Sequence, residues 1–365
     1  MTEMKRILTG MAAAWLAAIL FLPCKVNGVS AEHCILMDAV TDRVLYEKNA
    51  DDRALIASTT KIMTALVVCE QANVLDRVRI PKAAVGIEGS SIYLREGEIM
   101  TVQELLYGLM LHSGNDAAVA LAIYCGGTVE GFAQLMNDKA HRLGLTGTHF
   151  ENPHGLDSPG HYSTARDMAV LAAYAMENPI FSKTVSTKSV SAGGRNLRNH
   201  NKLLWRVDGA DGVKTGFTKA AGRILVSSAS RQGRRLIVVT MNAPDDWNDH
   251  AKLIEDGFSR FTVKNIVSKG DILGTVEIAG GEEQNVQLIA AEDFDYALAD
   301  DERVTIISRG TGFVYAPVAQ NQASGFAYVC IDGNAVGKIN LVYGDTVEQV
   351  KSKKSFWSKL FGEDR

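Results

Sequence analysis

The chain has 365 residues, of which 46% are hydrophobic, and a formal net charge of −4. This length is enough for two domains with a sizeable core, and the composition is that of an ordinary globular protein. The 38 basic residues are matched by 42 acidic ones and form no long stripe, so the sequence gives no indication of a nucleic-acid partner.

The N-terminal residues have the pattern of a secretory signal. Lys5 and Arg6 precede an apolar run over residues 7–23, and Val29-Ser30-Ala31 offers small residues suited to a signal peptidase. We therefore predict a cleaved signal over residues 1–31 and an exported protein at the outer face of the cytoplasmic membrane. The mature chain would begin at Glu32.

An uncleaved membrane anchor is the alternative, although the apolar run is short and contains Gly10 and Pro23. A lipid-modified Cys24 does not fit, because Leu22-Pro23 lacks the small residue that such a site needs before its cysteine. Four cysteines follow the signal, and they could form two disulfides or remain buried free thiols: Cys34, Cys69, Cys125 and Cys330.

After the signal the pattern begins with a strand hairpin, residues 34–38 and 44–48, around a Thr41-Asp42 turn. Residues 57–69 are apolar almost all round, which predicts a buried helix. Thr101 and Glu104 form a capping box that opens a second helix over residues 102–111. Further helices are expected over residues 116–124, 129–143 and 165–176.

From about residue 184 the pattern changes to strands, namely residues 211–217, 223–230 and 235–241, and an amphipathic helix follows over residues 246–258. Strands at both ends with helices between them predict an α+β domain over residues 32–262, in which one sheet joins both ends of the segment. Residues 263–346 alternate apolar and polar positions and predict a small all-β domain.

The last residues, 347–365, are basic and aromatic. Four large apolar side chains would share one helical face: Phe356, Trp357, Leu360 and Phe361. Such a helix can lie in a membrane interface, where anionic lipid attracts its lysines. We therefore predict an amphipathic helix that binds the membrane surface, with a solvated terminus as the alternative.

The chemistry-bearing residues come in three short motifs. Ser58-Thr59-Thr60-Lys61 places an amine beside a hydroxyl, because residues three apart share a helix face, and a partly desolvated lysine can act as a base. Alone, this motif is weak, since a serine cap followed by a solvated lysine gives the same pattern. Ser113-Gly114-Asn115 lies at a break between two helices. Lys214-Thr215-Gly216 lies on a predicted strand, where Gly216 would let a substrate backbone approach.

These motifs, in this order, resemble those of the low-molecular-weight penicillin-binding proteins that act as serine D-Ala-D-Ala carboxypeptidases (peptidase family S11). The similarity extends to residues 152–156, 161–165 and 199–204, and it covers residues 33–262 closely. The resemblance implies a fold shared with serine β-lactamases. A β-domain and an amphipathic C-terminal helix also recur in this family, with looser likeness.

The resemblance implies that Ser58 attacks the carbonyl between the two terminal D-alanines of a peptidoglycan stem peptide while Lys61 takes its proton. Ser113 and Lys214 would pass this proton to the leaving amine, and Asn115 would orient the acyl chain. The remaining substrate contacts would come from the strand. Lys214 and Thr215 would bind the terminal carboxylate, and Gly216 would lie against the substrate backbone. The backbone N–H groups of Ser58 and Phe217 would form the oxyanion hole. β-Lactam antibiotics would acylate Ser58, and no metal or other cofactor is implied.

Two positions depart from the family pattern. Phe217 stands where some relatives have histidine, and Asp245-Asp246-Trp247 stands where some have an arginine near the start of the last helix. A β-lactamase is the nearest enzymatic alternative, but residues 151–155 lack the E-x-x-L-N pattern whose glutamate drives deacylation. A DD-endopeptidase and a catalytically silent wall-binding scaffold are the others.

A metal site is also conceivable, since three histidines lie close together in sequence: His149, His154 and His161. They lack helical i,i+4 spacing and a carboxylate partner at ligand spacing. We therefore interpret His154 and His161 as loop residues that make hydrogen bonds.

Overall fold

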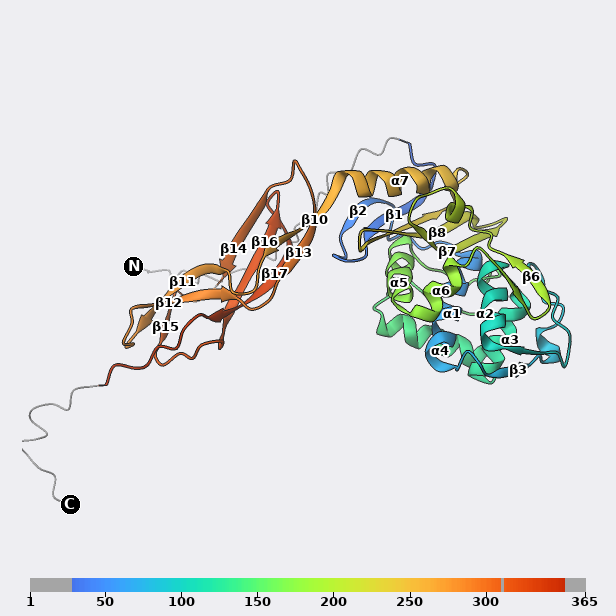
Figure 1. The fold of residues 1–365 in the computed structure, drawn as a ribbon, viewed down its shortest axis with the longest axis horizontal. Coiled ribbons are helices and arrows are strands. Elements are labelled where there is room, and N and C mark those ends of the chain that lie inside the picture. Colours follow the sequence, from blue (N-terminus) through green and yellow to red (C-terminus); the bar gives the residue numbers. More distant parts are fainter. Residues whose placement is uncertain (1–27, 310–311, 352–365) are drawn as a thin grey trace, which may run out of the picture.

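The structure is a computed structural model that describes residues 28–309 and 312–351. Figure 1 shows an elongated molecule, with a domain of helices and strands at one end and a β-domain at the other. The predicted amphipathic helix falls almost wholly on residues 352–365, and most of the predicted signal falls on residues 1–27. Both predictions therefore lie outside the described residues.

The first domain is built on a five-stranded antiparallel sheet with the order β2-β1-β9-β8-β7. Its strands are β1 (His33–Asp38), β2 (Val44–Lys48), β7 (Ala210–Thr218), β8 (Gly222–Arg231) and β9 (Arg234–Met241). Because β1 pairs with β9, strands from both ends of the segment lie side by side. The expectation that one sheet joins both ends is confirmed.

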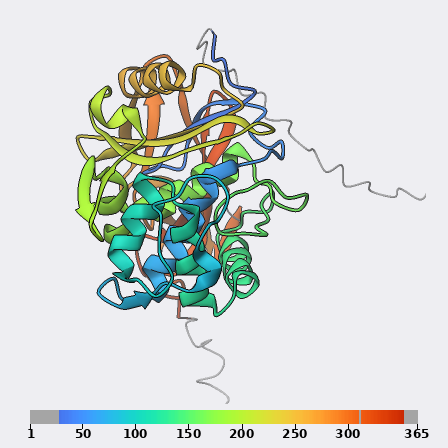
Figure 2. The same cartoon turned by 90° about the vertical axis from the view of Figure 1, so that its right-hand side faces the viewer.

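Six helices lie between these strands in sequence: α1 (Lys61–Gln71), α2 (Val102–Leu111), α3 (Asn115–Gly126), α4 (Val129–Arg142), α5 (Ala165–Glu177) and α6 (Pro179–Ser186). The helix α5 packs on one face of the sheet, and α7 (Asp246–Arg260) packs on the other. Figure 2 shows α7 above the strands and the helical cluster below them. The sheet is thus buried on both faces.

Local sequence signals explain several helix starts. Thr101 and Glu104 form the predicted capping box at α2, and the side chain of Thr128 caps α4. Asn178 caps α6, which has a proline in its first turn. The predicted change to strands at about residue 184 was therefore placed too early. The helix α6 extends to Ser186, and the next strand, β5 (Ser189–Ala192), begins after it. The strand β5 pairs with β6 (Arg195–Arg198).

The predicted helix over residues 57–69 is divided. Residues Ala57–Thr60 form a 3-10 turn, η1, and α1 begins only at Lys61. Ala57 has a positive φ of 43°, which an α-helix does not accommodate. The turn nevertheless continues directly into α1, which is buried along most of its length. Ser58 and Lys61 therefore lie on either side of a junction between two helix types.

The β-domain contains a six-stranded sheet with the order β14-β16-β17-β12-β11-β15 and a two-stranded pair of β10 and β13. The strands are β10 (Phe261–Val267), β11 (Ile272–Ala279), β12 (Asn285–Ala290), β13 (Phe294–Ala299), β14 (Val304–Arg309), β15 (Phe313–Tyr315), β16 (Ala323–Ile331) and β17 (Asn334–Tyr343). The expected all-β character of this domain is confirmed. No helix is present in its described residues, 261–309 and 312–351.

Arg43 connects the two domains. Its guanidinium, in the turn between β1 and β2, pairs with Glu302 and lies over the rings of Phe261 and Tyr296.

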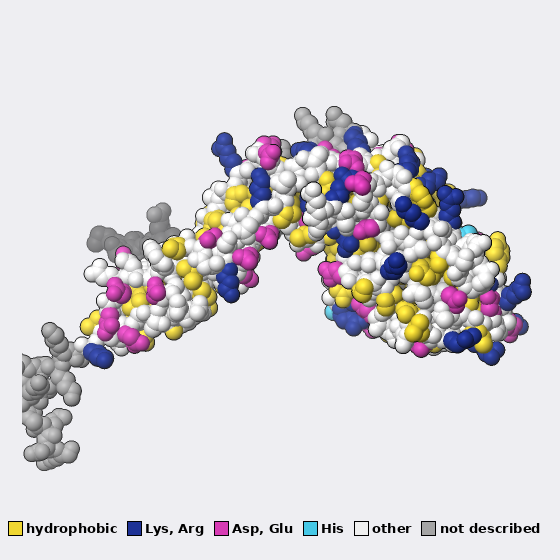
Figure 3. All heavy atoms as spheres, viewed as in Figure 1, with side chains coloured by type: hydrophobic (Ala, Val, Ile, Leu, Met, Phe, Trp, Pro, Cys, Tyr) yellow, Lys and Arg dark blue, Asp and Glu magenta, His cyan; other side chains and the backbone are white. Residues whose placement is uncertain are grey.

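On the face shown in Figure 3, charges of both signs are interspersed with scattered hydrophobic side chains. This distribution fits the near-balanced charge of the sequence.

Residues at two predicted boundaries take part in the fold. Ser30 donates from its backbone N and its hydroxyl to Asp249, and Ala31 is buried. A chain that began at Glu32 would lack these contacts. At the other end, Val347 is buried and pairs with Val318. The β-domain contacts thus continue past residue 346.

The four described cysteines are free thiols, and Cys34, Cys69 and Cys330 are buried. Burial raises the pKa of Cys69 to about 12 and that of Cys125 to about 11. The thiols of Cys69 and Cys125 are therefore protonated at neutral pH.

In the described part of the chain, no single helix is long and apolar enough to cross a membrane. Together, α3 and α4 have the required length and composition, but the pair is bent by 82°.

Candidate active site

Ser58 is held in a strained turn. Residues Ala57–Thr60 form η1, in which Ala57 has a positive φ of 43°. This conformation costs about 1–3 kcal/mol at a residue other than glycine and persists only where surrounding contacts hold it. Here the Thr60 hydroxyl donates to the carbonyl of Ala57 over 2.8 Å, and the N–H of Thr59 donates to the carbonyl of Ile56. The turn presents the partly exposed Ser58 side chain at its outer edge.

Lys61 lies directly behind this serine and is fully buried. Its Nζ is 3.0 Å from Ser58 Oγ, and it also donates to Asn115 Oδ1 (2.7 Å) and to the carbonyl oxygen of His154 (2.6 Å). Burial, followed by the charge of Lys214, lowers the pKa of Lys61 well below its usual value. Burial is the cause expected from the sequence. A neutral amine in contact with a hydroxyl can accept its proton.

Ser113 and Asn115 come from the break between α2 and α3. Ser113 has a positive φ of 65° and faces the same cleft as Ser58. Asn115 accepts from Lys61 through Oδ1 and donates through Nδ2 to the carbonyl of Glu88. Both ends of this amide are therefore engaged within the protein, so its visible effect is to hold Lys61. Its expected contact with the acyl chain stays a prediction.

The strand β7 completes the site. A Cβ at Gly216 would lie 3.3 Å from the backbone N of Ser58 and 3.3 Å from the carbonyl oxygen of Ile56, so the strand passes close to η1. Thr215, Gly216 and the exposed Phe217 line the cleft. Lys214 does not line the cleft, because its buried Nζ donates to the carbonyl of Thr215. Burial lowers the pKa of Lys214 to about 7.

The predicted residues brought together at this cleft come from three separate segments, and the cavity measures about 350 Å³. Ser58, Ser113, Thr215, Gly216 and Phe217 line it. Lys61, Asn115 and Lys214 form the buried layer behind this lining. The structure thus places the three sequence motifs around one opening.

Three comparisons with known proteins point to one family. The family pattern described as D-alanyl-D-alanine carboxypeptidase matches residues 23–245, and the pattern described as penicillin-binding protein 5, C-terminal domain, matches residues 261–349. The chain is 32% identical over 324 residues to the D-alanyl-D-alanine carboxypeptidase DacF of Bacillus subtilis, covering 84% of this chain and 83% of the relative. The protein belongs to the D-alanyl-D-alanine carboxypeptidase family.

Other relatives and solved structures support this membership. The family member DacC of Escherichia coli is 33% identical over 377 residues, which cover 96% of this chain and 94% of the relative. The crystal structure of penicillin binding protein 5 from Haemophilus influenzae superposes with a TM-score of 0.77 at 31% identity, covering 88% of this chain and 99% of that one. The similarity to these carboxypeptidases therefore includes both domains.

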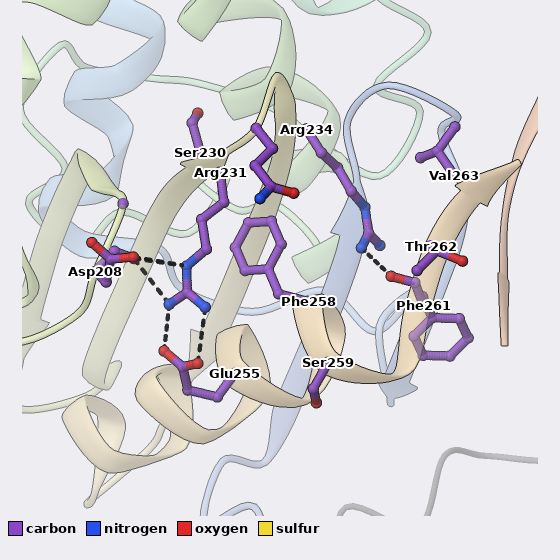
Figure 4. Close-up of a pocket in the computed structure, with 12 residues that line it drawn as sticks. Asp208, Ser230, Arg231, Arg234, Glu255, Phe258, Ser259, Phe261, Thr262 and Val263 are labelled. Carbon is purple, nitrogen blue, oxygen red and sulfur yellow. Dashed lines mark hydrogen bonds and ion pairs between the residues drawn. The ribbon is translucent and has the colours of Figure 1, made fainter. Parts of the chain in front are cut away.

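A second hollow, of about 720 Å³, lies at the junction between the domains (Figure 4). It is larger than the cleft at Ser58 but lacks the serine and lysine pair found there. Arg231 is held there between Glu255 and the carbonyl of Asp208, and Arg234 donates to the carbonyl of Phe261. None of the predicted site residues lines this hollow, so the smaller cleft at Ser58 is the candidate active site.

The segment that carries the three histidines supports the nucleophile turn. His161 accepts from the N–H of Glu151 through Nδ1, and its Nε2 lies 2.7 Å from the Thr60 hydroxyl. His154 Nδ1 accepts from the N–H of Leu156. Both histidines make hydrogen bonds within the loop, as expected, and burial lowers the pKa of each to about 4. Within the described residues, no group of three His, Cys, Asp or Glu side chains could hold a metal ion.

Several cleft residues were missed from the sequence: Ser90, His200, Lys202, Arg223, Ile224, Asp246 and Trp247. His200 and Lys202 belong to a segment whose family likeness could have suggested them. Arg223, by contrast, carries no motif signal. It reaches the cleft because β8 pairs with β7, so that Arg223 stands opposite Phe217.

Proposed function

We propose that this protein is a serine-type D-Ala-D-Ala carboxypeptidase that removes the terminal D-alanine from peptidoglycan stem pentapeptides through an acyl-enzyme on Ser58. The proposal rests chiefly on one observation, the 3.0 Å contact between Ser58 Oγ and the buried, pKa-lowered Lys61. The named relatives are carboxypeptidases of this specificity. The wall peptide as substrate agrees with the export signal predicted in the sequence.

In the first step, neutral Lys61 accepts the hydroxyl proton while Ser58 Oγ forms a bond to the carbonyl carbon between the two D-alanines. The backbone N–H groups of Ser58 and Phe217 stabilise the negative charge on the carbonyl oxygen. The C–N bond then breaks, and the proton passes to the leaving amine by way of Ser113, which lines the cleft, while Lys214 assists from the buried layer behind it. Water hydrolyses the ester and restores Ser58.

A β-lactam presents the same kind of carbonyl, and we expect its acyl-enzyme to persist. The only carboxylate that lines the described cleft is that of Asp246, and it pairs with Arg223. Glu151, in the segment compared with the β-lactamase glutamate, instead accepts from Ser158 and from the N–H of Gly160. No carboxylate of that segment is therefore placed to activate a water at Ser58.

The function is tested by incubating the wild-type protein with a fluorescent penicillin and, separately, with a tripeptide ending in D-Ala-D-Ala. Persistent labelling together with release of D-alanine supports the carboxypeptidase. Fast turnover of benzylpenicillin would favour a β-lactamase, and an unlabelled, inactive protein would favour a silent wall-binding scaffold. Cleavage of cross-linked dimers in preference to the pentapeptide would favour an endopeptidase.

The pH dependence of acylation is expected to respond to Lys214. The charge of Lys214 lowers the pKa of Lys61, so Lys214→Gln should raise it. Since only neutral Lys61 accepts a proton, the acylation rate falls as the pH drops through this pKa, and its midpoint should move to higher pH in the variant. The midpoint is measured from labelling rates between about pH 5 and 9. The control is Lys202→Gln, because Lys202 lines the cleft but does not contribute to the lowered pKa of Lys61. If the midpoint pH of acylation did not move in Lys214→Gln, the electrostatic coupling between Lys214 and Lys61 would be refuted.

We also propose that the C-terminal segment binds the membrane surface as an amphipathic helix. Because Val350 still donates to the carbonyl of Gly280, the test removes residues 352–365 and leaves the β-domain contacts in place. The truncated protein is expected to leave the membrane fraction and to keep full activity on the soluble tripeptide. A truncated protein that still sediments with membranes would refute this anchor.

A further inference from the structure

The cleft contains an arginine that the catalytic steps do not use. Arg223, on β8, lines the opening together with Ser58 and Thr215, and its side chain is 43% exposed. Its Nη2 donates to both carboxylate oxygens of Asp246, over 2.7 and 3.0 Å. Nε and Nη1 have no hydrogen-bond partner among the described residues. Donors therefore remain on this guanidinium for a ligand.

Two residues at the start of α7 orient this guanidinium. The Asp246 side chain is only 4% exposed, so it forms a fixed anchor, and the guanidinium carbon of Arg223 lies 5.9 Å from the ring centroid of Trp247. A carboxylate and an aromatic ring, both close to the guanidinium, limit the positions that the arginine can take. Such an arginine is ordered before a ligand arrives.

The position of Arg223 fits the end of a bound peptide. Register pairs Arg223 with Phe217 and Ile224 with Gly216, and a Cβ at Gly216 would lie 3.3 Å from the N of Ser58. Arg223 thus stands about one residue along the strand from the point where β7 meets the nucleophile turn. The terminal carboxylate of a D-Ala-D-Ala peptide also lies one residue, or about 3.5 Å of chain, beyond the scissile bond.

The charges in the cleft agree with an anionic group at this point. The lining contributes two cations, Arg223 and Lys202, against the single anion Asp246. Of the two residues expected from the sequence to hold the carboxylate, Thr215 lines the cleft, but Lys214 is buried behind the lining and directs its Nζ to the carbonyl of Thr215. The residues that line the cleft therefore carry a net charge of +1, and Arg223 is the arginine that a substrate carboxylate would meet in the open cleft.

We propose that Arg223 binds the C-terminal carboxylate of the substrate, with Asp246 and Trp247 as its positioning residues. This inference rests on the proposed function and assigns the carboxylate specificity of that site to a residue outside its three motifs. A bidentate arginine–carboxylate contact is planar and directional, which favours a free carboxylate over an amide at the same position. Arg223 therefore makes the enzyme selective for the last residue of a peptide.

The test compares Arg223→Gln with the wild type on two peptides, one ending in D-Ala-D-Ala with a free carboxylate and one with the terminal amide. We expect kcat/KM for the free acid to fall about 10- to 100-fold, mainly through KM, because a hydrogen bond to a charged group is lost. The rate on the amide should stay the same, so the preference for the acid is lost. Arg223→Lys, which keeps the charge, should recover part of the loss.

The matched control is Arg231→Gln. Arg231 also lies on β8 and pairs with an acid of α7, Glu255, but it faces the hollow at the domain junction rather than the cleft (Figure 4). This variant should keep the wild-type preference for the free acid. Thermal unfolding of each variant identifies any loss that arises from stability alone.

Three results would overturn the assignment of Arg223. They are an unchanged preference in Arg223→Gln, an equal loss on both peptides, and a loss of preference in Lys202→Gln while Arg223→Gln keeps it. In each of these cases the wild type still releases D-alanine, so the proposed function stands. A wild type that neither releases D-alanine nor binds penicillin would overturn the proposed function and this inference together.

Discussion

The variant Ser58→Ala is expected to take up no fluorescent penicillin and to release D-alanine at least about 10³-fold more slowly than the wild type. The hydroxyl that would form the acyl bond is gone, while Lys61 and the cleft remain. Lys61→Met should lower the labelling rate by about 10²- to 10⁴-fold, since methionine fills the buried space but accepts no proton. Both are measured as labelling rates at saturating penicillin.

The control for Lys61→Met is Lys139→Met. Lys139 is also a buried lysine of the helical cluster, and it pairs with Glu70 over 2.6 Å, away from the cleft. Its replacement should lower the thermal unfolding temperature but leave the labelling rate of the folded protein unchanged. Full labelling of Ser58→Ala would refute the nucleophile. Equal labelling rates for Lys61→Met and Lys139→Met would refute the base.

Gly155→Ala is expected to cause the largest loss of stability at a single position outside the motifs. Gly155 has a φ of +87°, and an added Cβ would lie 1.8 Å from the carbonyl oxygen of Ala57. Backbone strain and overpacking together should lower the free energy of unfolding by about 2–5 kcal/mol. Because the displaced carbonyl belongs to η1, Ser58 would also move, and acylation should slow by at least about 10²-fold.

Gly144→Ala separates strain from crowding. Gly144 has a similar φ of +71°, but a Cβ there meets nothing within 4 Å. This variant should lose about 1 kcal/mol of unfolding free energy and keep its acylation rate. Chemical denaturation gives the free energies, and penicillin labelling gives the rates. If Gly155→Ala were as stable and as active as Gly144→Ala, the loop would not be supporting the nucleophile turn.

The sequence predicted the elements whose signals are local. Thr101 and Glu104 marked the start of α2 because a capping box needs only neighbouring residues. The strands of the five-stranded sheet and the all-β character of the second domain were found from local alternation in the same way. The start of α6 was missed although Asn178 and Pro179 carry an N-cap and first-turn signal. The turn η1 was mistaken for helix, because apolar periodicity does not report the positive φ of Ala57.

The residues of the site also divide into those with a local sequence signal and those without one. The three motifs could be read from the sequence because each is contiguous, and the structure places all of them at one cleft. The contact between Arg223 and Asp246 could not be read, since it depends on how β8 and α7 pack together across 23 residues of chain. The engagement of both ends of Asn115 was equally hidden, because its partner Glu88 lies on a separate loop. Long-range packing decides these contacts.

The elongated arrangement of the two domains has a consequence for the proposed membrane anchor. The last described residues, beside Gly280 and Gly281, lie at the end of the β-domain that is farther from the helical domain (Figure 1). A surface that holds the chain at this end therefore keeps Ser58 at a height given by the length of the β-domain. The β-domain then acts as a spacer. In a chain anchored in this way, it would set which layer of a wall the cleft can reach, independently of the cleft's own chemistry.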